Sequence, residues 1–132
     1  MTDNPERALK EAESWLVSAK HSSVNAGEDD ASANVCCSQA IHAVIRANDA
    51  LSLKFLGHKP TRHDDAAIVF AKLVREGKLP KNSEDFKDLI ANAMRDKSGA
   101  DYGKQSFSQE DAQEYVELAE QFIAMVRDVV GI

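Results

Sequence analysis

The chain has 132 residues and a mass of 14.5 kDa, which is an ordinary size for one domain. Hydrophobic residues make up 43% of it and charged residues 29%, a balance typical of a soluble globular protein and not of a disordered one. The formal net charge of −6 disfavours a protein that binds nucleic acid over its whole surface, although it permits a local basic patch. We therefore expect a single domain over residues 1–132.

The sequence also bears on the compartment. Its apolar runs are only a few residues long, which excludes a membrane span, and the start, MTDNPERALK, lacks the basic and apolar regions of a signal peptide. Cys36 and Cys37 are adjacent, so a disulfide between them would need distorted geometry, and two cysteines alone give no zinc pattern. We expect a cytoplasmic protein without a membrane partner, in which both cysteines are small buried residues.

The first helix is predicted to begin after Asn4, a residue suited to cap it, with Pro5 at the first helical position. Apolar residues then recur every three or four positions, which indicates a helix with one apolar side: Ala8, Leu9, Ala12, Trp15, Leu16 and Ala19. After a polar break, a second helix is predicted from about Asp30 to Phe55, with Gly57 ending it.

The second predicted helix carries two apolar stripes. One consists of Cys37, Ile41, Val44, Leu51 and Phe55, and the other, made of small residues, consists of Ala40, Ala43, Ala47 and Ala50. Small side chains let neighbouring helices approach closely, so we expect this helix to be the central one, contacted on more than one side. Asn48 falls on its inward side, where it is either a buried amide bonded to a neighbouring helix or a ligand contact.

Three further helices are predicted from the same signals. Thr61 and Asp64 resemble a capping box before a third helix bearing Ala67, Phe70, Ala71 and Val74, which Gly77 ends. Ser83 is predicted to cap a fourth helix bearing Phe86, Leu89, Ile90, Ala93 and Met94, and Ser108 opens the last helix. The predicted fold class is all-α: an antiparallel, up-and-down bundle of four long helices plus a shorter fifth helix.

The clearest electrostatic feature is residues 54–63, which we call the basic segment. It contains no acidic residue and five basic or histidine residues: Lys54, His58, Lys59, Arg62 and His63. Positive charge and hydrogen-bond donors beside a helix N-terminus are what a phosphate group requires. The segment is therefore either a phosphate- or nucleotide-binding site or a solvated loop whose charges balance acidic neighbours.

Other motifs for chemistry are missing. The spacing of His58, His63 and the two aspartates that follow does not place them on one helical face, so we expect no metal site. His21 and His42 are single histidines on predicted helices, and they fit surface or packing roles. The chain has no G-x-S-x-G elbow, no Walker loop and no G-x-G-x-x-G, so we expect no cofactor.

Three segments, in order, resemble the HEPN family, the higher eukaryotes and prokaryotes nucleotide-binding domains, in its small stand-alone prokaryotic form. They are CCSQAIHAVIRANDALSLKFLG, the basic turn HKPTRHDDAAIVF, and RDKSGADYGKQSFSQEDAQEYVELAEQFI. The last segment is similar to the family's pattern of an arginine, a spacer, Asp-Tyr and an acidic helix start. The resemblance implies a five-helix bundle that is frequently dimeric and in many cases encoded beside a minimal nucleotidyltransferase.

The resemblance also implies a specific chemistry. Many HEPN proteins are metal-independent ribonucleases whose motif is an arginine, a histidine four to six residues later and often a tyrosine two residues after that. Here Arg95 matches the arginine and Tyr102 the tyrosine, but Ala100 and Asp101 stand five and six residues after Arg95. No arginine of the chain has a histidine four to six residues downstream.

Two functions follow from these observations. We favour a non-catalytic nucleotide- or RNA-associated module, an accessory protein that works with a minimal nucleotidyltransferase in a toxin–antitoxin-type system. It would bind its ligand through the basic segment, with Arg95 and Tyr102 contributing. The alternative is a metal-independent ribonuclease toxin with a rearranged active site of Arg95, Tyr102 and His63, in which His63 replaces the missing histidine and Arg62 or Arg95 stabilises the scissile phosphate.

We also expect a homodimer. The second predicted helix is apolar on two sides, and a bundle of this size is expected to leave one such face without a partner in the same chain. A two-fold, self-complementary interface would cover that face.

Overall fold

A computed structural model describes residues 3–25, 30–60, 65–101 and 106–131. These residues form five α-helices and one 3₁₀ helix, and they contain no strand, which confirms the predicted all-α class. In chain order the elements are α1 (Pro5–Asn25), α2 (Asp30–Leu56), α3 (Asp65–Arg75), the 3₁₀ helix η1 (Lys81–Asp85), α4 (Phe86–Asp101) and α5 (Gln109–Val130). With 11 residues α3 is the shortest α-helix, so the arrangement fits four long helices plus a shorter one. None of the described helices is long and apolar enough to cross a membrane.

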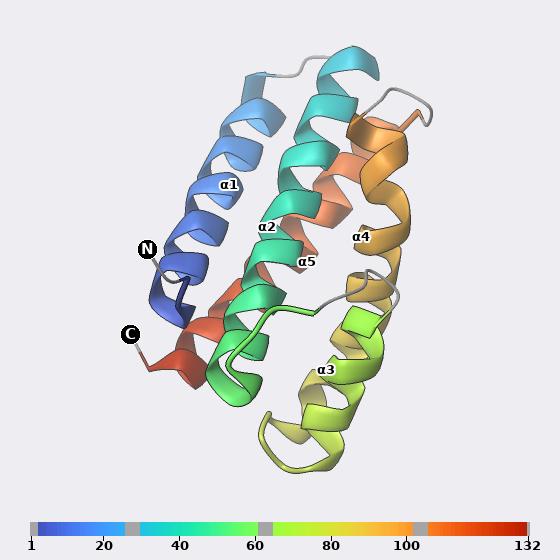
Figure 1. Ribbon diagram of the computed structural model, residues 1–132. Coiled ribbons are helices and arrows are strands. Elements are labelled where there is room, and N and C mark those ends of the chain that lie inside the picture. Colours follow the sequence, from blue (N-terminus) through green and yellow to red (C-terminus); the bar gives the residue numbers. More distant parts are fainter. Residues whose placement is uncertain (1–2, 26–29, 61–64, 102–105, 132) are drawn as a thin grey trace.

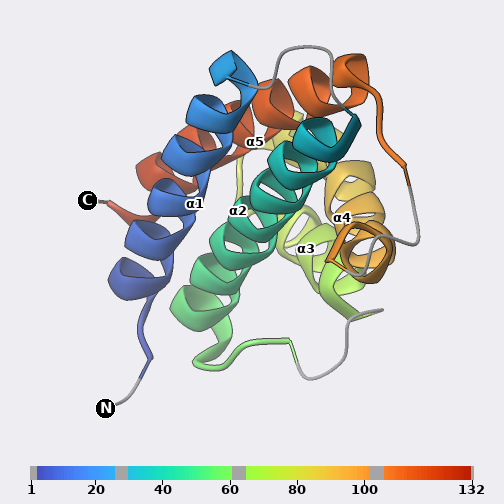
Figure 2. The same cartoon turned by 90° about the horizontal axis from the view of Figure 1, so that it is seen from above.

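Helix α2 is the central element, as predicted. It lies beside α1 in Figure 1 and contacts α5, α4 and α3 as well. Seen from above, α1, α5 and α4 surround it (Figure 2). Both of its stripes are buried: the four alanines of one stripe have no exposed surface, and in the other stripe Phe55 is half-buried while the remaining members have no exposed surface, namely Cys37, Ile41, Val44 and Leu51. We expected one apolar side of α2 to lack a partner in the same chain, and this expectation was wrong. A homodimer would have to use another surface.

Local signals determine most helix ends. The Asn4 side-chain oxygen accepts a hydrogen bond of 2.9 Å from the backbone N–H of Arg7, so Asn4 caps α1 as predicted. Ser108 and Asp111 form a complete capping box at the start of α5, with both hydrogen bonds at 3.0 Å. Gly57 follows α2 with a φ of +79°, a conformation that L side chains rarely adopt, and it thereby ends the helix.

Two expected details differ from the structure. Ser83 does not cap α4; it is buried within η1, and its hydroxyl donates to the carbonyl of Pro80 instead. The buried face of α3 is formed by Ala66, Phe70 and Leu73, so it is turned slightly from the face that was predicted. The capping pair predicted at Thr61 and Asp64 lies outside the described residues.

Two aromatic or polar side chains of the predicted core have unexpected surroundings. Trp15 is 39% exposed and stacks on His42 of α2, with ring centroids 4.7 Å apart. Asn48 is buried as expected, but its side-chain nitrogen has no hydrogen-bond partner among the described residues.

A charged cluster fastens the start of the chain to α2. Arg46, whose side chain is 15% exposed, contacts three carboxylates: Asp3 at 2.8 Å, Glu11 at 2.9 Å and Asp49 at 3.2 Å. Hydrogen bonds from Arg46 lower the pKa of Asp3 and of Glu11 below their ordinary values, whereas burial raises the pKa of Asp49. The guanidinium is thus the shared counterion of two helices and the N-terminal residues.

We predict that Arg46→Ala lowers the free energy of unfolding by about 2–4 kcal/mol, somewhat less than the cost of breaking a fully buried ion pair. The exposed pair of Arg7 and Glu11 supplies the matched control, because Arg7→Ala should cost about 0.5 kcal/mol or less. Urea unfolding at neutral pH measures both values. In acid the Arg46 effect should shrink: stability from Asp3 and Glu11 is present above their ordinary pKa values of 3.8 and 4.5 and is lost as the pH falls through their lower folded-state values. Equal effects of the two substitutions would contradict this account.

Candidate functional site

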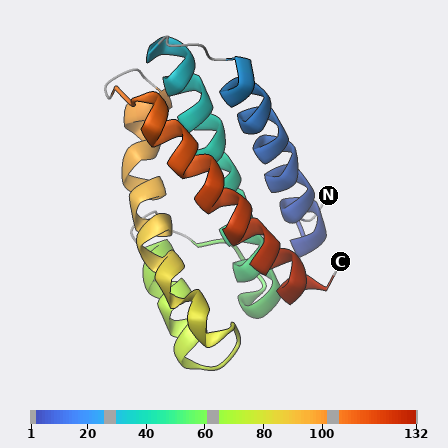
Figure 3. The ribbon, with the colours of Figure 1, turned by 180° about the vertical axis from the view of Figure 1, so that it is seen from behind.

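A groove lies between α4 and α5. Seen from behind, α5 runs in front of α2, with α1 on one side of it and α4 on the other (Figure 3). Both α4 and α5 pack on α2, and between them lies a hollow with a volume of about 1160 Å³. Phe86 lines the hollow, and its ring packs against the buried ring of Phe122 of α5, with ring centroids 5.3 Å apart. The aromatic side chains that line the groove are Phe86, Phe107 and Tyr115.

A chain of three polar side chains also bridges the two helices. The Tyr115 hydroxyl on α5 donates to one oxygen of Asp96 on α4, and Arg95 Nε donates to the other oxygen at 3.2 Å. Asp96 is only 5% exposed, so its charge is held in the protein by these two donors. Arg95 lies on the outside, with its side chain 69% exposed.

Tyr115 is tuned by the same contact. Burial and the neighbouring Asp96 carboxylate both raise the pKa of Tyr115, because they disfavour a second negative charge. The ring also packs edge-on against Phe107, at 6.2 Å between centroids, and the Phe107 backbone N–H donates to Asn34 of α2 at 2.7 Å. At neutral pH Tyr115 is therefore a fixed hydrogen-bond donor and not a base.

The described part of the basic segment lies elsewhere. Lys54, His58 and Lys59 are exposed, and His58 Nδ1 lies 2.9 Å from the carbonyl of Lys59. The positive charge of Lys59 contributes to lowering the pKa of Asp3 and opposes the rise at Asp49, so it lies within electrostatic reach of the Arg46 cluster. Arg62 and His63 lie outside the described residues.

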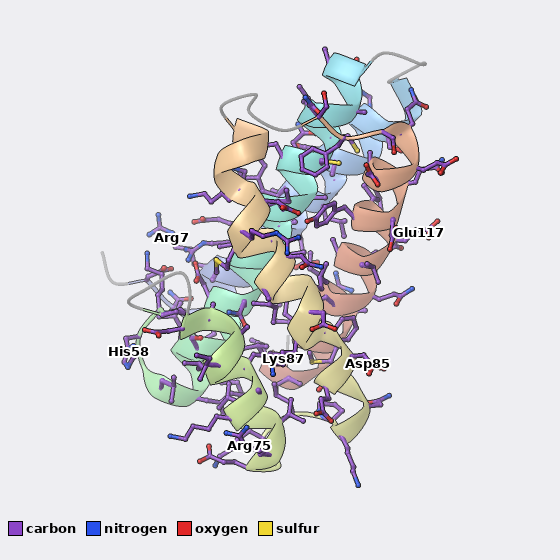
Figure 4. All side chains as sticks on the ribbon, turned by 90° about the vertical axis from the view of Figure 1, so that its right-hand side faces the viewer. Arg7, His58, Arg75, Asp85, Lys87 and Glu117 are labelled. Carbon is purple, nitrogen blue, oxygen red and sulfur yellow. The ribbon has the colours of Figure 1, made fainter. Side chains whose placement is uncertain are left out.

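The described part of the basic segment, residues 54–60, does not line the groove. His58 and Glu117 of α5 lie at opposite edges of the molecule in Figure 4. Helix α3 packs against α4, the helix that carries Arg95 (Figures 1 and 3). Tyr102, like His63, lies outside the described residues, so of the three residues of the ribonuclease alternative only Arg95 is placed.

The cysteines have the buried positions that were expected. Cys36 Sγ donates to the carbonyl of Ala19 at 3.3 Å, and burial raises the pKa of both thiols, that of Cys37 to about 12. A thiol with such a pKa is almost wholly protonated at neutral pH and is a poor nucleophile. No group of three or more His, Cys, Asp or Glu side chains in the described ranges is arranged to hold a metal ion.

Sequence reasoning missed Asp96 and Tyr115. Tyr115 has the helical spacing of a packing residue, and Asp96 stands beside Arg95 without a pattern of its own that marks it as buried. A buried tyrosine normally has a hydrogen-bond partner for its hydroxyl, so the predicted burial of Tyr115 indicates a polar partner without identifying it. The partner lies 19 residues away on another helix, so only the fold identifies it.

We predict that Tyr115→Phe lowers the free energy of unfolding by about 1.5–3 kcal/mol, since it leaves an oxygen of the buried Asp96 without its donor. In a Tyr102→Phe background Tyr115 is the single tyrosine, and its absorbance should show no tyrosinate near pH 10 while the protein stays folded. Because the folded-state pKa is raised, this contribution to stability is complete below the ordinary value of 10.0 and is lost as the pH rises through the folded-state value. Ordinary ionisation of Tyr115 in the folded protein would show that the contact with Asp96 is not made.

Comparison with known proteins assigns the chain to a family. The HEPN domain model matches residues 5–129, which includes every described helix up to the last turn of α5. No curated protein matches the chain. At the level of the family, the match supports a module associated with nucleotides or RNA. The five-helix architecture and the family match agree, and the chain belongs to the HEPN domain family.

Proposed function

We propose that this protein is a non-catalytic HEPN module that binds a nucleotide or RNA phosphate and acts as the accessory partner of another protein. Its ligand site is the basic segment, and Arg95 supplies a further cation on the side of the molecule where α3 meets α4. A minimal nucleotidyltransferase is the partner that the family suggests, in a toxin–antitoxin-type system, and a homodimer is the form in which the module works.

The surroundings of Arg95 carry this proposal. Cleavage of RNA through its own 2′-hydroxyl requires a group that moves a proton, and such a group contributes about 10²–10⁴-fold when it is correctly placed. Arginine stays protonated and does not fill that role. The group that contacts Arg95 is Asp96, which is buried and already accepts hydrogen bonds from Arg95 and Tyr115. The three described histidines lie on α1, on α2 and just after α2, not on α4 or α5.

The electrostatics of the described residues favour a ligand at the basic segment over one in the groove. Phosphate groups need cations, and the exposed Lys54 and Lys59 supply them, although Asp3 and Asp49 partly offset the charge of Lys59. The lining of the groove, in contrast, includes carboxylates and no lysine or arginine among the described residues. A phosphate ligand would be repelled there.

The first prediction concerns catalysis. Purified protein should cleave single-stranded RNA no faster than a buffer control in the presence of a metal chelator, because none of the described histidines lies on α4 or α5 to act as a general acid or base beside Arg95. Arg95→Ala and His63→Ala are the control variants, since they remove the cation and the histidine of the rearranged site. Cleavage by the native protein that disappears in either variant would overturn the proposal in favour of the metal-independent ribonuclease.

The second prediction concerns binding. Lys59→Glu combined with Arg62→Glu should weaken RNA binding by about tenfold or more at low salt and reduce the salt dependence of binding by about two counterions. Arg75→Glu combined with Lys78→Glu makes the same change of charge at the other end of α3, and it should leave most of the affinity intact. If both double variants weaken binding equally, the basic segment is not the site, and circular dichroism of each variant verifies that it is folded.

A further inference from the structure

The groove between α4 and α5 has a charge opposite to that of a nucleic-acid site. Its lining includes six carboxylate residues: Asp85, Asp88, Asp96, Asp111, Glu114 and Asp128. All of them except Asp96 are exposed, and they lie on η1, α4 and α5. The two lysines of α4, Lys87 and Lys97, are not among the lining residues. The groove is therefore a concave surface whose described charged lining residues are all acidic.

Helix α5 concentrates this charge. Within its 22 residues it has one basic residue, Arg127, and six acidic ones: Glu110, Asp111, Glu114, Glu117, Glu120 and Asp128. Arg127 pairs with Glu13 of α1, so its charge is directed to α1 and away from the groove. The helix thus carries most of the excess negative charge of a chain whose net charge is −6.

The floor of the groove is apolar. Leu118 and Met125 of α5 line it and are half-buried, as is Phe86 at the start of α4. Leu118 and Met125 are seven residues apart, two turns of one helix face, and the lining follows α5 from Asp111 to Asp128 over about 25 Å at 1.5 Å per residue. Apolar contacts at this repeat, and a flexible methionine among them, are what a helix laid in a groove requires.

The charge excludes two other occupants. A second copy of the chain docked on the same face would bring two acidic rims together, and like charges at an interface cost free energy. An RNA strand would meet carboxylates from both walls of the groove. A ligand with positive charge on its flanks and apolar side chains in its centre complements both the rim and the floor.

We propose that the α4–α5 groove is the docking site for a lysine- or arginine-bearing amphipathic helix of a partner protein. The apolar face of the partner helix lies on Leu118, Met125 and Phe86, and its basic residues pair with Asp88, Glu114 and Asp128. The site goes beyond the proposed phosphate site and is separate from it, so the protein holds an anionic ligand and a cationic partner on different faces.

The probe is a synthetic amphipathic peptide of about 16 residues, the length of α4, built from leucine, alanine and lysine. A matched peptide carries glutamate at each lysine position. Full-length protein should bind the lysine peptide in fluorescence anisotropy, more weakly as salt is added, and should not bind the glutamate peptide. Perturbation of the Leu118 and Met125 methyl resonances of the native protein should accompany binding.

Matched variants test the rim. Asp88→Asn, Glu114→Gln and Asp128→Asn together should weaken lysine-peptide binding by about tenfold. Glu84→Gln, Glu110→Gln and Glu117→Gln remove the same charge from exposed positions outside the lining and should leave binding nearly unchanged.

Three outcomes would overturn the proposal: an equal loss of lysine-peptide affinity in both triple variants, equal binding of the two peptides, or methyl shifts confined to other residues. Displacement of the lysine peptide by RNA at the same methyls would assign the groove to RNA. If RNA does not bind at the basic segment, peptide binding at the groove can still be measured. The phosphate-site proposal and the groove proposal can therefore be rejected independently of each other.

Discussion

The fold depends on how closely other helices approach α2. Ala40, Ala43, Ala47 and Ala50 have no exposed surface, and such small side chains allow neighbouring helices to pack tightly against one backbone. The apolar faces of α1, α4 and α5 pack against the two stripes of α2, so all three helices are arranged around this one helix. Helices α4 and α5 both pack on α2, and their contacts with each other include the ring pair of Phe86 and Phe122 and the hydrogen bond from Tyr115 to Asp96. The groove between them is thus a consequence of the central helix.

The same arrangement separates charge. Lys54 lies in the last turn of α2 and Lys59 just after it, whereas Glu117 of α5 lies at the opposite edge of the molecule from His58 (Figure 4). At physiological salt, electrostatic interactions between exposed charges fade over about 8 Å. An acidic net charge is therefore compatible with a local basic surface, which is the surface that the proposed phosphate ligand requires.

Sequence reasoning succeeded where the determinant is local and failed where it is not. Asn4, Gly57 and Ser108 act on backbone groups within four residues, so their roles could be read from the sequence. The periodic stripes likewise identified α2 as central. Arg46 in contrast pairs with residues 35 and 43 positions away, and Asp96 meets Tyr115 across 19 positions. Ser83 is a local prediction that was wrong, because its hydroxyl donates to the nearby carbonyl of Pro80 instead of capping α4. The candidate groove joins two helices and has no signature in either one.

Arg95 and Asp96 place opposite charges on two sides of α4. Neighbouring residues of an α-helix point about 100° apart, so Asp96 turns inward to Tyr115 while Arg95 is directed to solvent. Among the described residues, Arg95 donates through Nε to Asp96, and its side chain is otherwise directed to solvent. A guanidinium held at Nε keeps the planar fork of N–H donors that suits phosphate oxygens. Under the proposed function this exposed cation binds the phosphate, and none of the described histidines lies on α4 or α5 to transfer a proton beside it.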